Sequence, residues 1–115
     1  MAIYREGVIH YAQPAGVNLT GKLFHFAAVD SSGNIVLSGA GGNVIGVIME
    51  EATIGNAATV QVDGIAKVKT SGNVSAGARV QSDANGQCQS LQSGVAVGIA
   101  LTGAIAGDII PVKMF

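Results

Sequence analysis

The segment Gly16 to Leu23 (GVNLTGKL) resembles a phosphate-binding loop, in which glycines and a lysine cradle phosphates and a final serine or threonine binds magnesium. Leu23 stands where that hydroxyl is required. Gln13-Pro14-Ala15 precedes the segment where a buried strand should stand, and an apolar strand follows where a helix should supply amides for the phosphates. No acidic residue ending an apolar strand offers a second magnesium ligand. The sequence therefore argues against nucleotide binding.

The other candidates for catalysis have no partners at a useful spacing. His10 and His25 are expected on separate strands, with no serine, cysteine or aspartate spaced for a triad. His25 alternates to the face opposite its two phenylalanine neighbours, which predicts a surface or interface residue. Glu50-Glu51 could suggest acid–base work, but one carboxylate faces each side of a strand end, which favours a solvated turn. We expect no enzymatic activity, no cofactor and no bound metal.

Cys88 is the only cysteine, so it forms neither an intrachain disulfide nor a cysteine-based metal site. We expect it as a small, half-buried side chain on a short strand. Two glycosylation patterns, Asn18-Leu-Thr20 and Asn73-Val-Ser75, lack relevance because the N-terminus has no apolar core typical of a signal peptide. No apolar run of about 18 residues could span a membrane. We expect no membrane partner and no export by the signal-peptide route.

The composition is poor in charge and rich in glycine. The chain has 115 residues, enough for one domain, with 17 Gly and 11% charged residues, against a usual charged share of about 25%. The net charge of -1 argues against a nucleic-acid partner. Lys67, Lys69 and Arg79 form the only loose positive group, which we interpret as a solvated strand face. Such an uncharged β-protein usually hides surface in an assembly, although a monomer with a bland surface is the alternative.

The clearest periodicity runs from Ala58 to Thr70 (ATVQVDGIAKVKT), where apolar and polar residues alternate with Ile65 as the only exception. This alternation predicts a half-buried strand. Asp63-Gly64 could instead form a hairpin turn, but that turn would mix apolar and charged residues on each face, so we favour one unbroken strand. Because thirteen residues exceed the usual length of about 3–10, we expect a bend or bulge at Gly64.

Short strands separated by turn signals account for the rest of the chain, with no helical periodicity sustained over three turns. We expect strands at Val8–Tyr11, Leu23–Val29, Ile35–Leu37, Val44–Glu50, Ala78–Ser82, Gln87–Ser90, Val95–Thr102 and Ile109–Met114. Turn signals that recur every eight to twelve residues are typical of an all-β sandwich or barrel.

The second half of the sequence repeats the first. Placing residues 46–62 over 98–114 without a gap puts Gly46 on Gly98 and Gly55 on Gly107. Upstream, the Asp-x-x-Gly turn at residues 30–34 matches that at 83–87. The apolar matches could arise by chance, but the ordered turn chemistry favours duplication. The predicted fold is a single all-β domain over 1–115, a small β-barrel or sandwich built from half-repeats at about 17–62 and 73–115, preceded by an extended arm at 1–6.

Short motifs rich in glycine, alanine and valine, spread over nearly the whole chain, resemble those of a family of small bacteriophage proteins, the capsid cement or decoration proteins. Some members of this family carry an old label as RecA- or RadA-like recombinases. The residues that carry the resemblance are Glu6-Gly7-Val-Ile-His-Tyr11, Pro14-Ala-Gly16, Gly46-Val47-Ile48, Val60-Gln-Val62-Asp-Gly64-Ile65, Ser75-Ala-Gly77-Ala-Arg-Val80 and Gly98-Ile-Ala. One departure is Gln81-Ser82, because relatives tend to have an aromatic residue just before Asp83. The defective phosphate loop does not support the recombinase label.

The resemblance implies a structural virion protein that binds the outside of an assembled phage capsid. Its partners would be the major capsid protein and itself, commonly as a homotrimer, and each copy would bridge neighbouring capsid subunits. A largely uncharged surface suits burial between subunits because little desolvation opposes it. The alternative is a generic, non-enzymatic β-barrel binding module of another phage or surface assembly.

The N-terminal arm supplies the candidate capsid contacts. These are Ala2, Ile3, Tyr4, Arg5 and Glu6. Ile3 and Tyr4 have no evident place in a core built from the two half-repeats. An extended segment of this kind can add to a partner's sheet edge, with its apolar side chains entering adjacent pockets.

Overall fold

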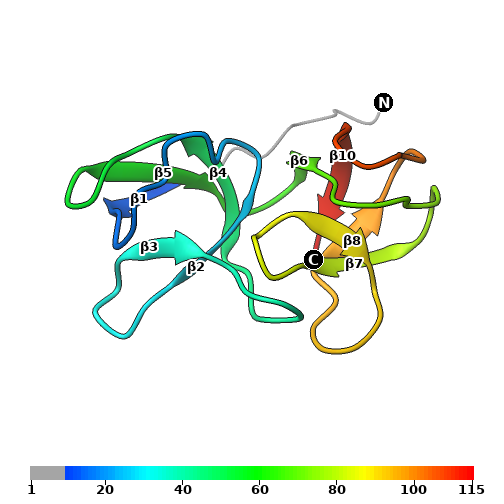
Figure 1. Ribbon diagram of the computed structural model, residues 1–115, viewed down its shortest axis with the longest axis horizontal. Coiled ribbons are helices and arrows are strands. Elements are labelled where there is room, and N and C mark those ends of the chain that lie inside the picture. The colour runs from blue at the N-terminus through cyan, green and yellow to red at the C-terminus, as the bar shows by residue number, and fades with distance from the viewer. Residues whose placement is uncertain (1–9) are drawn as a thin grey trace, which may run out of the picture.

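The structure is a computed structural model that describes residues 10–115. In this range it contains ten strands and no helix, which confirms the all-β prediction (Figure 1). The strands are β1 (His10–Pro14), β2 (Phe26–Val29), β3 (Ile35–Leu37), β4 (Gly46–Glu50), β5 (Ala57–Gln61), β6 (Ile65–Lys69), β7 (Arg79–Ser82), β8 (Cys88–Ser90), β9 (Gly98–Ala100) and β10 (Ile109–Met114).

The strands form two open, antiparallel five-stranded sheets rather than one closed barrel. The first has the order β1-β5-β4-β2-β3 and the second the order β6-β10-β9-β7-β8. Each strand of the first sheet therefore has a counterpart at the same place in the second, five strands later in the chain. We call residues 10–61 the first half and 65–115 the second half, and Figure 1 shows them beside each other. The fold is built from two tandem half-repeats, as the sequence predicts.

The matching turns also have matching hydrogen bonds. The Asp30 carboxylate accepts the amides of Ser32 and Asn34 at 2.9 and 3.0 Å. The Asp83 carboxylate accepts the amides two and four residues later, both at 2.8 Å. An aspartate that holds backbone amides beyond it stabilises a tight turn. Gly46 and Gly98 open β4 and β9, which occupy equivalent places in the two sheets. The repeated unit also contains β1 and β6, so it begins earlier than the expected 17–62 and 73–115.

The expected unbroken strand from Ala58 to Thr70 is wrong. The chain leaves β5 after Gln61, bends at Gly64, where φ is +78°, and enters the other sheet as β6. The two strands do not pair, since β5 lies between β1 and β4 whereas β6 pairs with β10. The hairpin alternative is therefore wrong too. The alternation continues through the bend because each strand turns one face to the core of its own half.

Strand ends in the apolar runs also differ from the prediction. The run Leu23–Val29 is a strand only from Phe26 onward, and Phe24 has a left-handed backbone with φ of +64°. The run Val95–Thr102 pairs only at Gly98–Ala100. Apolar side chains in the flanking loops pack without joining a ladder, which an apolar pattern alone does not reveal.

Two apolar clusters make up the core, one in each half. The first-half cluster comprises Ala15, Leu19, Ala27, Ile35, Ile48, Ala52, Ala58 and Val60. The second-half cluster comprises Ala66, Val68, Val74, Val80, Cys88, Val97, Ala100, Ile110, Val112 and Met114, together with Phe26 and Val47. Phe26 and Val47 belong to the first sheet, so they fasten it to the second half. Their burial helps to pack the two sheets into one molecule.

Candidate interaction surfaces

The segment that resembles a phosphate loop is an anchored surface loop between β1 and β2. Leu19 is fully buried and its amide donates to the carbonyl of Ala52 at 2.8 Å. The Asn18 side chain accepts the Thr20 amide at 3.1 Å, which closes a local turn. The segment leads into a turn and then β2, so it opens no helix that could present amides to a phosphate. Its residues position the loop on the first-half core.

His25 is buried, which corrects the expected surface or interface position. Its side chain is 3% exposed. The ring Nδ1 lies 3.0 Å from the Leu23 carbonyl and Nε2 lies 3.4 Å from the Gln87 side-chain nitrogen of the second half. Because the chain turns at Phe24, strict alternation does not apply here. His25 is a structural residue at the contact between the halves.

Cys88 is fully buried rather than half-buried. Burial, and next the negative charge of Asp83, raise the pKa of its thiol to about 12. The thiol therefore stays protonated at neutral pH, whereas the thiolate is the nucleophile and the metal ligand. Glu50 and Glu51 are both exposed, as expected for a solvated strand end. Among residues 10–115, no cluster of three or more His, Cys, Asp or Glu side chains could hold a metal ion.

Buried polar side chains are used to hold the molecule together. The Gln61 amide donates to the carbonyls of Asp63 and Ile65 at 3.1 and 2.9 Å, which fixes the crossing between the sheets. The Thr70 hydroxyl donates to the Ile105 carbonyl at 2.7 Å. Within the described range, no buried side-chain nitrogen or oxygen lacks a hydrogen-bond partner. No such atom is therefore left to receive a ligand.

A shallow apolar groove of about 310 Å³ lies where the two halves meet. Its lining comprises Asn43, Val44, Ile45, Val62, Val95, Ala96, Val97, Met114 and Phe115. Among the described residues that line it, only Asn43 has a polar side chain, so these residues offer no constellation for chemistry. Phe115 is 61% exposed and lies against the Arg79 guanidinium, 5.7 Å from the ring centroid.

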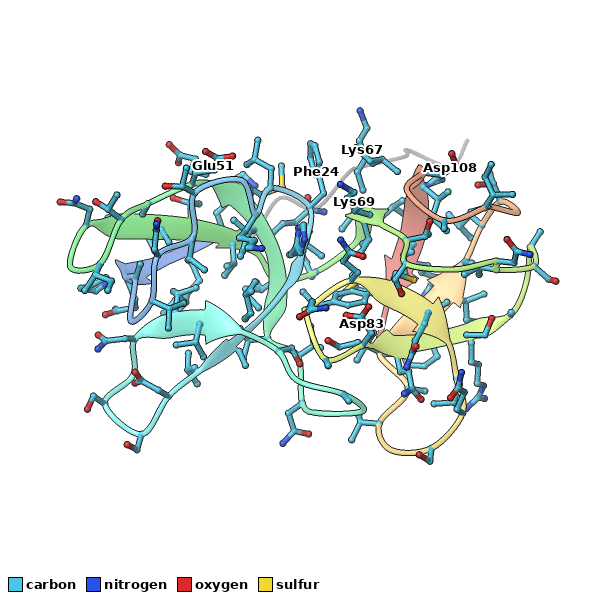
Figure 2. All side chains as sticks on the ribbon, in the orientation of Figure 1. Phe24, Glu51, Lys67, Lys69, Asp83 and Asp108 are labelled. Atoms are coloured by element: carbon cyan, nitrogen blue, oxygen red, sulfur yellow. The ribbon has the colours of Figure 1, made fainter. Side chains whose placement is uncertain are left out.

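The outer face of the second sheet carries most of the positive charge. Arg79 pairs across the sheet with Ile99, and Ile99 pairs with Lys113. Lys67 and Lys69 face the same way on β6, opposite Pro111 and Ile109. The labelled lysines lie close together near the upper edge of the molecule in Figure 2. Four of the six lysine and arginine residues therefore share one sheet face.

The sequence identified only part of this face. Lys67, Lys69 and Arg79 were expected as a loose positive group, but Lys113 and Ile99 were missed. Lys113 could have been found from the alternation of Ile109–Met114, which puts the lysine on the outer side. The proposed contacts Ala2 to Glu6 lie outside the described residues. No helix long and apolar enough to cross a membrane occurs between residues 10 and 115.

Comparison with known proteins identifies the family. Residues 13–114 match the phage cement protein family. The chain belongs to this family. The match spans both half-repeats, from β1 to the end of β10.

A solved structure shares the fold of this cement protein. It is the N base of the head fibre protein gp8.5 of bacteriophage phi29, with a TM-score of 0.79 and 12% sequence identity. The similarity covers 93% of each chain. At that identity the likeness shows the fold alone. A comparison with curated proteins finds no match.

The departure from the cement-protein pattern, Gln81-Ser82, lies in the contact between the halves. Ser82 is fully buried, its hydroxyl faces the Ser38 carbonyl at 3.4 Å and its carbonyl accepts the Gly41 amide at 2.9 Å. The Gln81 side chain accepts the amides of Gln92 and Ser93. The two residues before Asp83 are therefore held by hydrogen bonds. Ser82 bonds to the backbone of the first half, and Gln81 bonds to the backbone of a second-half loop.

Proposed function

We propose that this cement protein binds the outer surface of an assembled phage capsid and stabilises it by bridging neighbouring capsid subunits. The single observation that carries the proposal is the family match over residues 13–114. The proposed mechanism is mechanical, because each bridging copy adds contacts that must break before the shell opens. The proposed partners are the major capsid protein and further copies of the chain, as a homotrimer made in the host cytoplasm and located on the virion.

Several features of the chain support a structural role over catalysis. Among the described residues no His, Cys, Asp and Glu side chains gather into a metal-binding cluster, and the Cys88 thiol is buried and protonated. The surface offers exposed apolar side chains with few charges, led by Ile54 at 68% and Ile105 at 65% exposure. Exposed apolar surface favours burial against another protein. We therefore propose a non-enzymatic protein.

The N-terminal residues Ala2 to Glu6 remain the proposed capsid contact. They precede β1, so both half-repeats are complete without them. Burial of a side chain such as Ile3 or Tyr4 contributes about 1.5–3 kcal/mol. Three arms in one trimer would act together through local concentration.

Co-sedimentation with purified heads that lack cement protein tests this proposal. The full chain should bind heads saturably, and a variant without Ala2 to Glu6 should fold and assemble normally but bind much more weakly. A double variant, Ile3→Ser with Tyr4→Ser, separates the apolar contacts from arm length. Failure of the full chain to bind any heads would contradict the function. Tight binding by the shortened chain would instead place the contact on the two sheets.

A further inference from the structure

The contact between the two halves joins unlike surfaces. On the first half it uses an outer row across three strands, Phe26, Val47 and Gln61, which we call the first docking row. Phe26 and Val47 are fully buried in the second-half core. A contact between two different surfaces of a repeated unit is heterologous. In a pair of such units, the first unit leaves its receiving surface free and the second unit leaves its docking surface free.

The surface that receives the first docking row is also well defined. Besides the second-half core side chains against which Phe26 and Val47 pack, it comprises Ser82 and the turn at residues 83–86. The Phe26 amide donates to the Gly86 carbonyl at 2.6 Å, and a Cβ added to Gly86 would lie 2.9 Å from the Phe26 oxygen. Ser82 is buried under the loop that holds Ser38 and Gly41. We call this the second-half receiving surface.

The second half has its own docking row, which the first half does not cover and which, within the described chain, touches only the Phe115 ring at its Arg79 end. Arg79, Ile99 and Lys113 pair in the same way across β7, β9 and β10 as the first row does across β2, β4 and β5. Arg79 and Lys113 are exposed and Ile99 is partly exposed. The first docking row has apolar side chains at two positions, Phe26 and Val47. The second docking row instead has a cation at each end, Arg79 and Lys113.

The first half has the matching receiving surface, also uncovered. Val29 pairs with Ile35 as Ser82 pairs with Cys88, so Val29 is the counterpart of the buried Ser82. Val29 is nevertheless 43% exposed. Gly33 is the counterpart of Gly86, and no atom lies within 4 Å of a Cβ added there. An exposed apolar side chain therefore stands beside open space, at the place where the second half is covered.

Because the other half covers neither of these two surfaces, we infer that they bind each other between copies. The second docking row of one copy binds the receiving surface around Val29 and Gly33 of another copy, head to tail. This inference rests on the self-association included in the proposed function and names the surfaces for it. Charge favours the same occupant, because Asp30 is the only charged residue between residues 28 and 37 and would lie beside the cationic row. A heterologous contact closes into a ring when its rotation permits, and otherwise forms open chains.

Two variants of the full chain remove one surface each. Arg79→Glu reverses the charge of the docking row, and Val29→Arg places a cation on the receiving surface. Both side chains are exposed, so folding should be unchanged by circular dichroism and thermal melting. In sedimentation velocity over a concentration series, each variant should associate about ten-fold or more weakly than the wild type. Ile105→Arg, a control at an exposed apolar side chain outside both surfaces, should associate normally.

Mixing the two variants gives the decisive result. The Val29→Arg copy keeps its docking row and the Arg79→Glu copy keeps its receiving surface, so the mixture should form a heterodimer with one copy of each. Native mass spectrometry distinguishes it because the two masses differ. Normal association of either variant, absence of the heterodimer, or a wild type that is monomeric at every concentration would overturn the inference. Binding of the wild type to heads would still decide the proposed function separately.

Discussion

The docking rows of the two halves occupy equivalent positions but differ in chemistry. Phe26, at the end of the first row, is completely buried, whereas its counterpart Arg79 is exposed and lies against the Phe115 ring. The strand order and pairing are the same in both sheets. A repeated backbone can therefore present an apolar row for a permanent contact within the chain and a cationic row for solvent or another protein.

The same difference extends to the receiving surfaces. A Cβ on Gly86 would meet the Phe26 carbonyl and the side chains of Leu37 and His25, whereas one on Gly33 would meet no atom within 4 Å. Both turns are shaped by an aspartate that binds two backbone amides. The difference therefore comes from what packs against each turn and not from the turn itself.

The largest expected effect separates the two docking rows. Phe26→Ala should lower the free energy of unfolding by about 3–5 kcal/mol, since it empties a fully buried site between the halves. The matched change Arg79→Ala should lower it by less than about 1 kcal/mol, mainly through the lost contact with Phe115. Urea denaturation measures both. Equal losses would break the comparison, because they would mean that the second row is structural as well.

Substitution of Gly46 and Gly98 tests whether the halves are equivalent at the two places where a glycine lies against the backbone of the neighbouring strand. A Cβ on Gly98 would lie 2.5 Å from the Lys113 carbonyl oxygen, and one on Gly46 would collide with that of Gln61. Gly46→Ala and Gly98→Ala should each destabilise by about 3 kcal/mol, because backbone must move to admit the methyl group. Gly72→Ala, which meets no atom within 4 Å, is the control for urea denaturation. A neutral Gly98→Ala beside a damaging Gly46→Ala would contradict the equivalence.

A residue of the second half should make the stability fall at alkaline pH. Cys88 of the second half is the counterpart of Ile35 of the first half. The pKa of its thiol is raised from 9.0 to about 12. Between these values the folded chain keeps a proton that the unfolded chain loses, so stability falls as pH rises through this window. From about pH 8 to pH 10.5 the wild type should lose about 2 kcal/mol more than Cys88→Ala. Parallel urea curves for the two proteins at both pH values would refute the assignment.

The smallest effect concerns the left-handed residue that precedes β2 or β7. The first half has Phe24 there at a φ of +64°, and the second half has Gly77 at +82°. Gly77→Ala should destabilise by about 1 kcal/mol because a Cβ is disfavoured in this conformation. Thermal melting of this variant beside Gly72→Ala measures the difference. A fully neutral Gly77→Ala would mean that the backbone can relax at this turn.

The elements predicted accurately are those whose pattern and boundaries agree. Ile35–Leu37 and Ile109–Met114 are found as expected because turn residues precede both and their side chains alternate or pack in the core. Ala58–Thr70 was predicted wrongly because alternation reports which face is buried, not which sheet the strand joins. The bend at Gly64 preserves the alternation, so only the three-dimensional pairing reveals the change of sheet.

The candidate surfaces were harder to predict for a related reason. The repeat already aligns Gln61 with Lys113, but sequence does not tell which of the two is covered by the other half. His25 is expected as a surface or interface residue from its alternation, but the turn at Phe24 buries it between the halves. The repeated unit could therefore be predicted from the sequence. The contact between the two halves could not, because it depends on side chains brought together from both halves.

Heat disruption of DNA-filled heads tests whether the protein stabilises the capsid. Heads lacking cement protein would be incubated with the wild-type chain or with buffer, and DNA release would be followed by a dye as the temperature rises. Saturating protein should shift release to a higher temperature, because bridged subunits must break added contacts. Protein that saturates the heads without changing the release temperature would contradict a stabilising role.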